Sequence, residues 1–598
     1  QVGAVGAHDQ IDESGLRAGR LVGRVTSGAT SHSVGHCISM AYVEAEVAQP
    51  GNTVEVQVLE RRIPATIIKA SPYDPKYKRP RTYLTSYSEA EMGEDIFTRK
   101  GGRAARRASR LNAPVIHHPP LITQVPLYEV ANAEGEEQIH ELAMRIVEEL
   151  GVEFRESQAL EIWGKTDAEI SGQNVRVNRR TLLDLVAKAP SEFTHHARNP
   201  ERTVKVGGPS KVVSPSYGPA FIYDLEGVRR PATREDLDNL QKLNHMASTV
   251  HIAGGPVVEP RDVPVPHRHL HMAQSGFTYS DKPIVGNVTS IERARDTVEM
   301  CKIVFGAQFA ANNCCTTSLI NSNSPLVWDE TMLGALRVYA ENNHAVMCSP
   351  FSMAGASTPA SNVGTMAIVT AEALMAIAFA QLVRPGAPML FGVPAMTVAL
   401  NSGAPVHGSP DSGLVQFLAG QMARRYGVPH RAIANCATSK SADMQAGFDS
   451  MWGLFPSFLC GAHWITMGGG MMEGTLGVGY AKTVLDFEQL DAFYHFCQGP
   501  QFEDMDDVFD TIRGVGPGGH FLGTAHTRRS NLFIFPSQNN TTFEQWEAEG
   551  CKSSEQVGIE KARTWLDRYE PPEMDSSLKE GLDDFVNERE SAIPKTLE

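Results

Sequence analysis

The sequence lacks two features that would place it in or on a membrane. It has no uninterrupted apolar run of about 18 residues, the length that a membrane-spanning helix needs. Its formal net charge is −15, which argues against a surface for nucleic acid or anionic lipid. The first ten residues, QVGAVGAHDQ, include no initiator methionine, basic stretch or apolar stretch. We therefore expect no secretory signal, and a chain that begins in this way is compatible with being a fragment of a longer polypeptide.

Paired cysteines and metal-binding motifs are also scarce. The nine cysteines form no CxxC pair, and an odd, scattered set in so long a chain is typical of a reduced, cytoplasmic protein. Cys314 and Cys315 are adjacent, but neighbouring side chains point apart on a strand, and no HxC or HExxH motif stands nearby. His267, His269 and His271 have a spacing that splays their rings on a helix. We interpret both groups as structural and expect no tightly bound metal.

Residues 1–82 contain short β-like segments, among them an alternation of Val54, Val56 and Val58 that predicts a half-buried strand. The stretches GRVTSGATSHSVGHCISMAYV, PGNTVEVQVLERRIPATIIK and PYDPKYKRPR resemble the C-terminal barrel of the aminomethyltransferase (glycine cleavage T-protein) family. The resemblance implies a small all-β barrel module. In that family the preceding domains largely build the folate pocket, so folate binding does not carry over to this chain.

A basic stretch follows at residues 99–114, with five arginines and one lysine. In an acidic protein such a run favours a solvated linker, or a helix that docks on an acidic face, over a nucleic-acid site. We place residues 83–205 as this linker followed by a helical cap, because GEEQIHELAMRIVEELGV and NRRTLLDLVAKAP have helical periodicity.

Short apolar segments then alternate with helix-like stretches, which predicts a (β/α)8 TIM barrel over residues 206–480 and a helical region over 481–598 that completes the barrel domain. The eight segments are 211–218, 250–258, 282–289, 311–320, 344–350, 388–393, 431–438 and 463–468. Thr233 and Asp236 predict a capped helix start. The other helices are expected near residues 292–304, 329–342, 363–383, 412–426 and 442–460.

The predicted C-terminal ends of these strands, where barrels of this kind place their chemistry, carry few acids and bases. We take Lys440, Asp443 and Glu473 as the candidates for proton transfer. Most other residues at these ends are small, polar or glycine. Such a site admits a broad ligand and does little acid–base work itself.

Five long motifs stand in order between about residues 97 and 565, namely AGASTPAS, AEALMAIAFAQLVRPGAPMLFG, QMARRYGVP, TSKSADMQAGFDS and GPGGHFLGTAHT. In these motifs the chain resembles the trimethylamine methyltransferase family of corrinoid-dependent enzymes. The resemblance implies transfer of a methyl group from an amine to the Co(I) of a corrinoid (cobalamin) on a separate carrier protein. Every residue is one of the twenty ordinary amino acids, whereas members that act on trimethylamine carry pyrrolysine. This departure implies a quaternary or tertiary amine such as glycine betaine as the donor. We also expect a homo-oligomer that binds neither membrane nor nucleic acid.

A permanent cation without N–H groups is held best by aromatic faces. The candidates near predicted strand ends are Tyr217, Phe277, Tyr279, Phe351 and Trp464, although each could be ordinary core. Ser439 and the amides after it, Lys440, and Arg268 are candidates for a substrate carboxylate. The stretch HWITMGGGMMEG offers bare backbone to a flat corrin ring at Gly468, Gly469 and Gly470, with Met471 as soft lining, and Gly392 ends an earlier strand. A tight turn packed by methionine is the alternative for this stretch.

Two other functions remain open from the residues. One is a folate-linked or metal-dependent one-carbon transferase, which predicts bound zinc or tight folate binding. The other is a non-catalytic subunit that docks a corrinoid partner, which predicts a carrier protein that co-purifies while methyl transfer fails with every amine.

Overall fold

A computed structural model of the 598-residue chain describes residues 2–3, 14–17, 20–31, 36–44, 46–58, 61–68, 117–393, 396–500, 502, 504–529 and 539–596. The chain divides into two compact units, Gln1–Ala113 and Pro114–Glu598. The basic stretch at 99–114 and the turn-rich segment at 71–82 lie outside the described residues. The finer domain boundaries at 82, 205 and 480 remain predictions.

The smaller unit contains an antiparallel β-sheet of six strands in the order β1-β4-β3-β2-β5-β6. The strands are β1 (Val2–Gly3), β2 (Ser14–Arg17), β3 (Arg20–Ser31), β4 (His36–Val43), β5 (Thr53–Val58) and β6 (Arg61–Thr66). Val54 and Val56 are buried and the intervening Glu55 is exposed, so the predicted alternation is confirmed at these two valines, while the burial of Val58 lies outside what the structure describes. Their partners in the core are Val22, Val47, Ala65 and Ile67.

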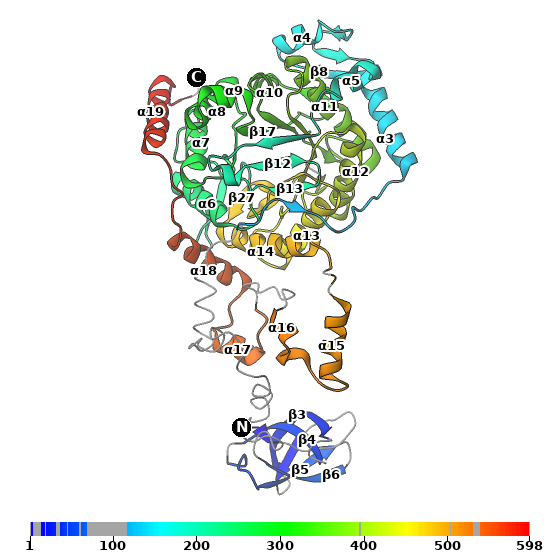
Figure 1. The fold of residues 1–598 in the computed structure, drawn as a ribbon, viewed down its shortest axis with the longest axis vertical. Helices are drawn as coiled ribbons and strands as arrows, with labels where there is room; N and C mark the ends of the chain where they lie inside the picture. The colour runs from blue at the N-terminus through cyan, green and yellow to red at the C-terminus, as the bar shows by residue number, and fades with distance from the viewer. Residues whose placement is uncertain are drawn as a thin grey trace. The chain divides into compact units, whose positions relative to one another are not determined.

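The larger unit is built on a curled sheet in which seven strands run parallel (Figure 1). In the order in which they are hydrogen-bonded, they are β13 (Ser210–Val213), β25 (Trp464–Thr466), β24 (His430–Ile433), β21 (Met389–Gly392), β19 (Ala345–Cys348), β17 (Thr316–Ile320) and β16 (Ile284–Val285). Each lies within or next to a segment that the sequence predicts as a strand. Because the strands are parallel, their C-terminal ends meet along one edge of the sheet, which we call the rim.

The predicted second strand, residues 250–258, does not form a regular strand. Its amides reach both neighbours, since His251 N donates to Val213 O at 2.9 Å and Ala253 N donates to Pro283 O at 2.9 Å. The run Gly254-Gly255-Pro256 follows at once, and Gly254 has a φ of +84°. A glycine in this conformation, followed closely by a proline, ends the extended backbone before a regular hydrogen-bonded ladder with the neighbouring strands can form. The segment therefore lies between β13 and β16, but the sheet does not run through it as a continuous ring.

Helices separate the strands along the chain and cover the outside of the sheet, as the sequence predicts (Figure 1). They are α6 (Arg234–Met246), α7 (Arg268–Tyr279), α8 (Ile291–Phe305), α10 (Glu330–Glu341), α11 (Asn362–Val383), α12 (Pro410–Tyr426), α13 (Met444–Leu459) and α14 (Tyr480–Cys497), with the short α9 (Ala307–Asn312) after α8. The capping box of Thr233 and Asp236 is present at the start of α6. Helix α11 is long and apolar enough to cross a membrane, but 83% of its most apolar window is buried in the fold, as expected of a core helix.

The predicted helical cap before the barrel contains more β structure than expected. Its helices are α3 (Ala133–Arg145), α4 (Ser157–Trp163) and α5 (Arg179–Val186). Its strands β8 (Val152–Phe154), β9 (Glu169–Ser171) and β10 (Asn174–Arg176) pair with one another and with β18 (Val327–Trp328). A hairpin of β11 (Glu192–His195) and β12 (Val204–Gly207) continues into β13. Phe193, Val204 and Val206 alternate with exposed residues, and this period of two overrides the expectation of a helix.

Two small sheets lie beyond the rim. Strands β20 (Met353–Ala354), β22 (Met396–Val398) and β23 (Pro405–Val406) join the loops that follow β19 and β21. Strands β14 (Phe221–Tyr223), β15 (Arg229–Pro231), β26 (Met471–Met472) and β27 (Gly477–Gly479) join the loops that follow β13 and β25. Long loops from four parallel strands are thus fixed by hydrogen-bonded ladders above the sheet.

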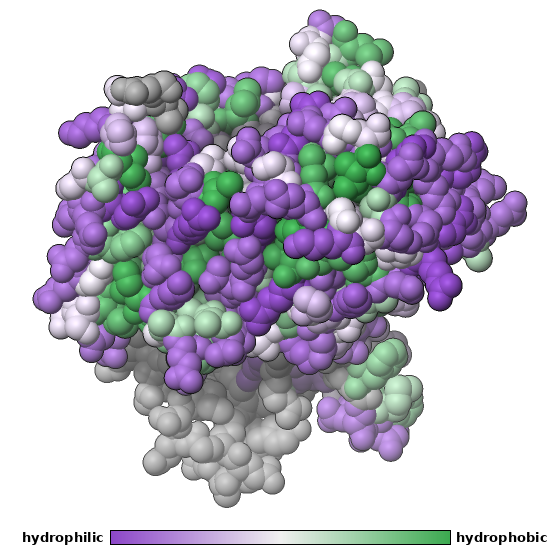
Figure 2. Space-filling view, turned by 90° about the horizontal axis from the view of Figure 1, so that it is seen from above, coloured by the Kyte–Doolittle hydropathy of each residue, from purple (hydrophilic) through white to green (hydrophobic). Residues whose placement is uncertain are grey.

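The described part of the region after residue 480 is helical, as predicted. Beyond α14 it contains α15 (Met505–Val515), α16 (Ala525–Arg529), α17 (Phe543–Ala548), α18 (Ser554–Asp567) and α19 (Ser576–Ala592). Helix α18 packs on α14 and α6, and α19 packs on α7 and α8. Figure 2 shows one face of the larger unit, on which apolar residues form separate patches among hydrophilic ones.

Candidate functional site

The interior of the curled sheet has two layers. The lower layer is apolar and includes Val212, Leu390 and Trp464 together with Phe193 and Val206 from the hairpin of β11 and β12. The hairpin therefore fills the end of the sheet opposite the rim. The upper layer, nearer the rim, contains Ile433, Cys436, Met467 and Met471. Tyr217 packs against both layers.

A single guanidinium lies between these layers. Arg431 is paired in register with Trp464 on the neighbouring strand, so both side chains project to the inner face. The side chain of Arg431 is 1% exposed. Its Nη1 donates to Ser349 Oγ at 2.9 Å, and its Nε has no hydrogen-bond partner. Arginine has five N–H donors, so most of its capacity to bind an anion is unused in the described part of the chain.

No carboxylate of the described residues forms an ion pair with Arg431, although an unpaired buried ion is destabilising by several kcal/mol as an order of magnitude. Burial lowers its pKa to about 10, while the Cys436 thiol and the Tyr217 phenol act in the opposite direction. The guanidinium thus remains protonated at neutral pH. The fold retains a buried positive charge without an internal counter-ion, which is the arrangement expected for binding an anionic ligand.

Gly392 makes room for this guanidinium. It ends β21 and is paired with Arg431 across the sheet. A Cβ at this position would lie 3.3 Å from Arg431 Cδ, 3.3 Å from Ser349 Cβ and 2.8 Å from Cys348 O. The sequence predicts Gly392 as a ligand-binding position, and the structure places it in contact with Arg431 and Ser349 instead of at an open surface.

His407 and Tyr217 complete the surroundings of Arg431. His407 is buried, its Nε2 lacks a hydrogen-bond partner, and burial together with the charge of Arg431 lowers its pKa to about 4. It is therefore neutral at pH 7. Tyr217 remains partly exposed, and burial raises its pKa well above the ordinary value of 10. We call Arg431, Ser349, Gly392, Tyr217 and His407 the arginine site.

The three candidates for proton transfer all have other partners. Lys440 is exposed, and its Nζ donates to Thr438 O at 2.8 Å. Asp443 is the N-cap of α13, where it accepts hydrogen bonds from Ala446 N and from the hydroxyls of Ser439 and Ser441. Ser439 is thereby part of the capping turn. These contacts describe a well-satisfied helix start.

Glu473 joins two loops at the rim. Its Oε1 accepts hydrogen bonds from Tyr223 Oη and Arg229 Nε, both at 2.7 Å, while its Oε2 is buried and has no partner among the described residues. Burial alone raises the pKa of Glu473, but the hydrogen bonds from Arg229 and Tyr223 hold it below the ordinary value. Glu473 is therefore a carboxylate at neutral pH, paired with Arg229.

The glycines that follow β25 are packed against the chain itself. A Cβ at Gly469 would lie 2.8 Å from Phe487 Cε1, and one at Gly470 would lie 2.2 Å from Thr483 Oγ1, both on α14. A Cβ at Gly468 would lie 2.8 Å from Val213 Cγ1. The expectation that these three glycines expose backbone to a corrin ring is not supported, because their space is taken by α14 and β13. Met471 is different, since it is buried in the upper layer beside Tyr217.

The aromatic candidates are dispersed. Trp464 lies in the lower layer, stacks on His195 and donates from Nε1 to Ser214 Oγ at 2.9 Å. Phe277 is buried among the outer helices with Phe305, and Tyr279 ends α7, before β16 begins and away from the rim. Phe351 is 40% exposed in the loop after β19, two residues beyond Ser349. Of these candidates, Tyr217 and Phe351 lie near the arginine site toward the rim, and Trp464 lies beside Arg431 on the neighbouring strand.

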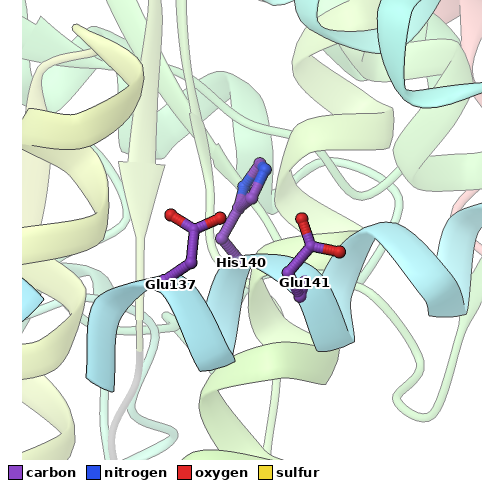
Figure 3. Close-up of side chains that lie close together, drawn as sticks. All are labelled: Glu137, His140 and Glu141. Atoms are coloured by element: carbon purple, nitrogen blue, oxygen red, sulfur yellow. The ribbon is translucent and has the colours of Figure 1, made fainter. Parts of the chain in front are cut away.

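Possible metal ligands outside the rim have internal partners. Among the described residues one group brings enough ligand atoms together, namely Glu137, His140 and Glu141 on α3 (Figure 3). Glu137 pairs with Arg425 at 2.8 Å, Glu141 pairs with Arg179 at 2.9 Å, and His140 Nδ1 lies 2.9 Å from Tyr426 Oη. The group is a network of surface ion pairs, and a metal is not needed to satisfy it.

The histidine triplet and the cysteine pair are structural. His269 Nε2 lies 2.8 Å from Asp296, and His271 Nε2 lies 2.8 Å from Glu590 on α19, while His267 reaches a backbone carbonyl of Ile593. The triplet thus attaches the C-terminal helix. Cys314 and Cys315 are buried, and burial raises the pKa of Cys314 to about 12.

Sequence reasoning missed Arg431. The signal was available, because the predicted strand RAIANCAT begins with arginine although its other residues are apolar or small. A charge at the inner face of a buried parallel strand is uncommon and marks a functional candidate. Arg268, which the sequence offers as a carboxylate ligand, binds Glu259 and Val263 O.

Comparison with known proteins gives two family matches. Residues 99–594 match the trimethylamine methyltransferase (MTTB) family, and residues 7–74 match the glycine cleavage T-protein C-terminal barrel domain. The chain is 36% identical over 469 residues to a glycine betaine methyltransferase from Desulfitobacterium hafniense, covering 78% of this chain and 98% of the relative.

Two further relatives are more distant. A trimethylamine methyltransferase MttB from Desulfitobacterium hafniense is 25% identical over 76% of this chain and 92% of its own length. A proline betaine:corrinoid methyltransferase from Eubacterium limosum is 25% identical over 64% of this chain and 81% of its own length. Since the family match extends over most of the chain, this protein belongs to the trimethylamine methyltransferase family.

Proposed function

We propose that this chain transfers a methyl group from a quaternary amine of the betaine type to the Co(I) of a corrinoid that a separate protein carries. The family match and the relatives named as betaine methyltransferases support this function. The corrinoid is the methyl acceptor in this reaction and thus a substrate of the enzyme. The cobalt contributes the electron pair of the new Co–C bond, and the C–N pair leaves with the nitrogen.

The observation that carries the proposal is the state of the acids and bases at the rim. Asp443 caps a helix, Glu473 is paired with Arg229, and Lys440 is exposed and bound to a carbonyl. A quaternary nitrogen departs as a neutral tertiary amine and takes up no proton during the step. Displacement therefore depends on orientation and exclusion of water, which a barrel interior lined with apolar side chains provides.

Few side chains of the upper layer could contact a corrinoid acceptor, because most candidates already have partners within the chain. Tyr217 and Met471 at the upper layer are neutral and offer no strong ligand to cobalt, so they leave the metal free to react with carbon. Glu473, held by Arg229 and Tyr223, fixes the position of the loop after β25. Gly469 and Gly470 of this loop let α14 pack closely against it, and Gly468 does the same for β13.

Several finer statements also belong to this proposal. The extended segment at 251–253 occupies the place between β13 and β16, and its hydrogen bonds to Val213 and Pro283 support a (β/α)8 barrel whose second strand is irregular. The enzyme acts in the cytoplasm and needs no bound folate. It needs no bound metal either, and the ion pairs of Glu137 and Glu141 with arginines support this part of the proposal. A homo-oligomer stays an expectation from the sequence.

Mixing the full chain with cob(I)alamin and a panel of methyl donors tests the function. The panel comprises glycine betaine, proline betaine, trimethylamine and tetramethylammonium. We expect the Co(I) absorbance to convert to that of methyl-Co(III) with at least one quaternary donor, and no conversion without protein. If the Co(I) absorbance persists with every donor, whatever the ratio of protein to cobalamin, the proposal is contradicted.

A further inference from the structure

Arg431 differs from three other buried cations of the larger unit in what surrounds it. Arg337 pairs with Glu156 at 3.0 Å and Lys482 pairs with Asp486 at 2.6 Å. Lys282 donates to three carbonyl oxygens near the end of α6, those of Asn244, Ala247 and Val250. Arg431 has one hydroxyl, Ser349 Oγ, and no carboxylate or carbonyl partner in the described part of the chain. A partner that is not part of this protein is therefore expected.

We propose that the guanidinium of Arg431, together with the hydroxyl of Ser349, binds the carboxylate of the methyl donor, so that this enzyme selects amines that carry a carboxylate close to the quaternary nitrogen. The inference rests on the proposed function and names the substrate class of the same site. A carboxylate is the anion that matches the planar fork of arginine in a bidentate manner, and two of the unused N–H groups suffice for it.

The position of the other residues of the arginine site supports a zwitterion over a simple anion. Tyr217 lies close enough to Arg431 to act on its pKa and still keeps part of its surface exposed. In an α-betaine a single carbon separates the carboxylate from the quaternary nitrogen, so an anchored carboxylate brings that nitrogen next to Arg431. An aromatic face at this position suits the cationic end of the same ligand.

Charge balance leads to the same conclusion. His407 is neutral at pH 7, Cys436 is a buried thiol, and Glu473 is already paired with Arg229. Trimethylammonium or choline would thus meet an uncompensated positive charge in the interior, whereas a betaine carboxylate neutralises it. The like-charge repulsion excludes donors that lack the carboxylate.

Calorimetric titration of the full chain with two matched ligands tests the inference without any mutation. Glycine betaine and choline share the quaternary nitrogen and differ in carboxylate against alcohol. We expect choline to bind at least about 30-fold more weakly, the lower end of the effect of removing one partner from a buried charge pair. Equal affinity for the two ligands would overturn the inference.

Variants give a second, independent test. Arg431→Lys keeps a charge but loses the fork, and Arg431→Gln removes the charge. Both variants should bind glycine betaine more weakly than the wild type does, and the difference in affinity between glycine betaine and choline should become smaller. Lys211→Met is the matched control, because it removes a buried cation at the opposite end of the sheet, where Ala462 O is the one hydrogen-bond partner of Lys211 Nζ among the residues that the structure describes. If Arg431→Lys is folded by circular dichroism and binds glycine betaine as wild type does, the assignment is wrong.

The outcomes separate this inference from the proposed function. Methylation of cob(I)alamin by tetramethylammonium as fast as by glycine betaine would refute the role of Arg431 while the methyltransferase function stands. Binding of glycine betaine that requires Arg431, with no donor ever methylating cobalamin, would support the carboxylate site and refute the function.

Discussion

Gly392 and Arg431 stand opposite each other on neighbouring parallel strands, and the missing side chain of the glycine gives the guanidinium its place in the interior. The pairing explains why a glycine ends β21 although its backbone has no positive φ. The glycine is required by a close approach of the neighbouring side chain.

Gly392→Ala should therefore displace Arg431. The added methyl group would lie 3.3 Å from Arg431 Cδ and 2.8 Å from Cys348 O, so either the arginine or the strand must shift. We expect affinity for glycine betaine to fall about tenfold, because a hydrogen bond to a charged group is worth roughly 1.5–3 kcal/mol. Titration calorimetry measures it. Gly447→Ala on α13 is the control, since nothing lies within 4 Å of its added methyl group. Unchanged affinity in Gly392→Ala would contradict this role.

Asp443 should prove to be a helix cap and not a proton donor. Asp443→Ala removes the acceptor for Ala446 N and should lower the free energy of unfolding by about 1 kcal/mol. Asn caps as well as Asp, so Asp443→Asn should restore stability and retain wild-type turnover. Urea unfolding and the cobalamin assay measure the two quantities. A stable Asp443→Asn protein without turnover would instead establish a catalytic carboxylate.

Glu473 and Tyr223 should act as a unit that holds the loops after β13 and β25 together. Each single change, Glu473→Ala or Tyr223→Phe, breaks the 2.7 Å hydrogen bond between them and should destabilise by about 1–3 kcal/mol. Because the double variant loses the same interaction only once, its effect should be smaller than the sum of the two. A double-mutant cycle in urea measures this coupling, and strict additivity would show that the contact contributes nothing.

Mild acid should destabilise the larger unit. Burial lowers the pKa of His195, His251 and His430 to about 3 and that of His344 to about 4, from an ordinary value of 6.5. Because the folded pKa is depressed, the unfolded chain takes up protons first as the pH falls below 6.5. The free energy of unfolding therefore decreases as the pH falls from 6.5 toward the pKa values of the folded state. At pH 5 the decrease is about 2 kcal/mol per histidine. Urea unfolding at pH 7, 6 and 5 checks this, and a flat profile would be inconsistent with four buried neutral histidines.

The rate of methyl transfer should be nearly independent of pH where the fold is stable. Near the arginine site, His407 titrates at about 4 and Arg431 at about 10, so neither changes its charge at intermediate pH. Below about 4 a charged His407 would repel the donor, and above about 10 Arg431 would lose its proton and its hold on a carboxylate. Single-turnover rates between roughly pH 6 and pH 9 provide the measurement. A bell-shaped profile in that range would indicate an acid or base that we have not identified.

The sequence predicted the alternation of strands and helices because burial imposes strong patterns. Parallel strands such as β17 and β19 are buried along their whole length, and the capping box of Thr233 and Asp236 is a local signal that needs no tertiary context. The predicted strand at 250–258 was wrong as a regular strand because its Gly-Gly-Pro run ends the extended backbone.

The site was harder to predict, because it depends on contacts between distant segments. Nothing local shows that Gly469 and Gly470 are packed against Phe487 and Thr483, or that Glu473 is held by Tyr223 and Arg229, about 250 positions earlier. Asp443 looked like a proton donor because a capping carboxylate and a catalytic one have the same sequence signature. Arg431 was overlooked since its lack of a carboxylate partner among the described residues becomes visible only in the folded structure.

The stoichiometry of a single turnover with methyl-labelled glycine betaine tests the central claim most directly. The full chain is mixed with excess cob(I)alamin and the labelled donor, with no added metal or folate, and the cobalamin and amine products are quantified together. We predict one labelled methyl-Co(III) for each dimethylglycine formed. Dimethylglycine without a cobalt-bound methyl group, or product only after a folate or a metal ion is added, would contradict methyl transfer to Co(I).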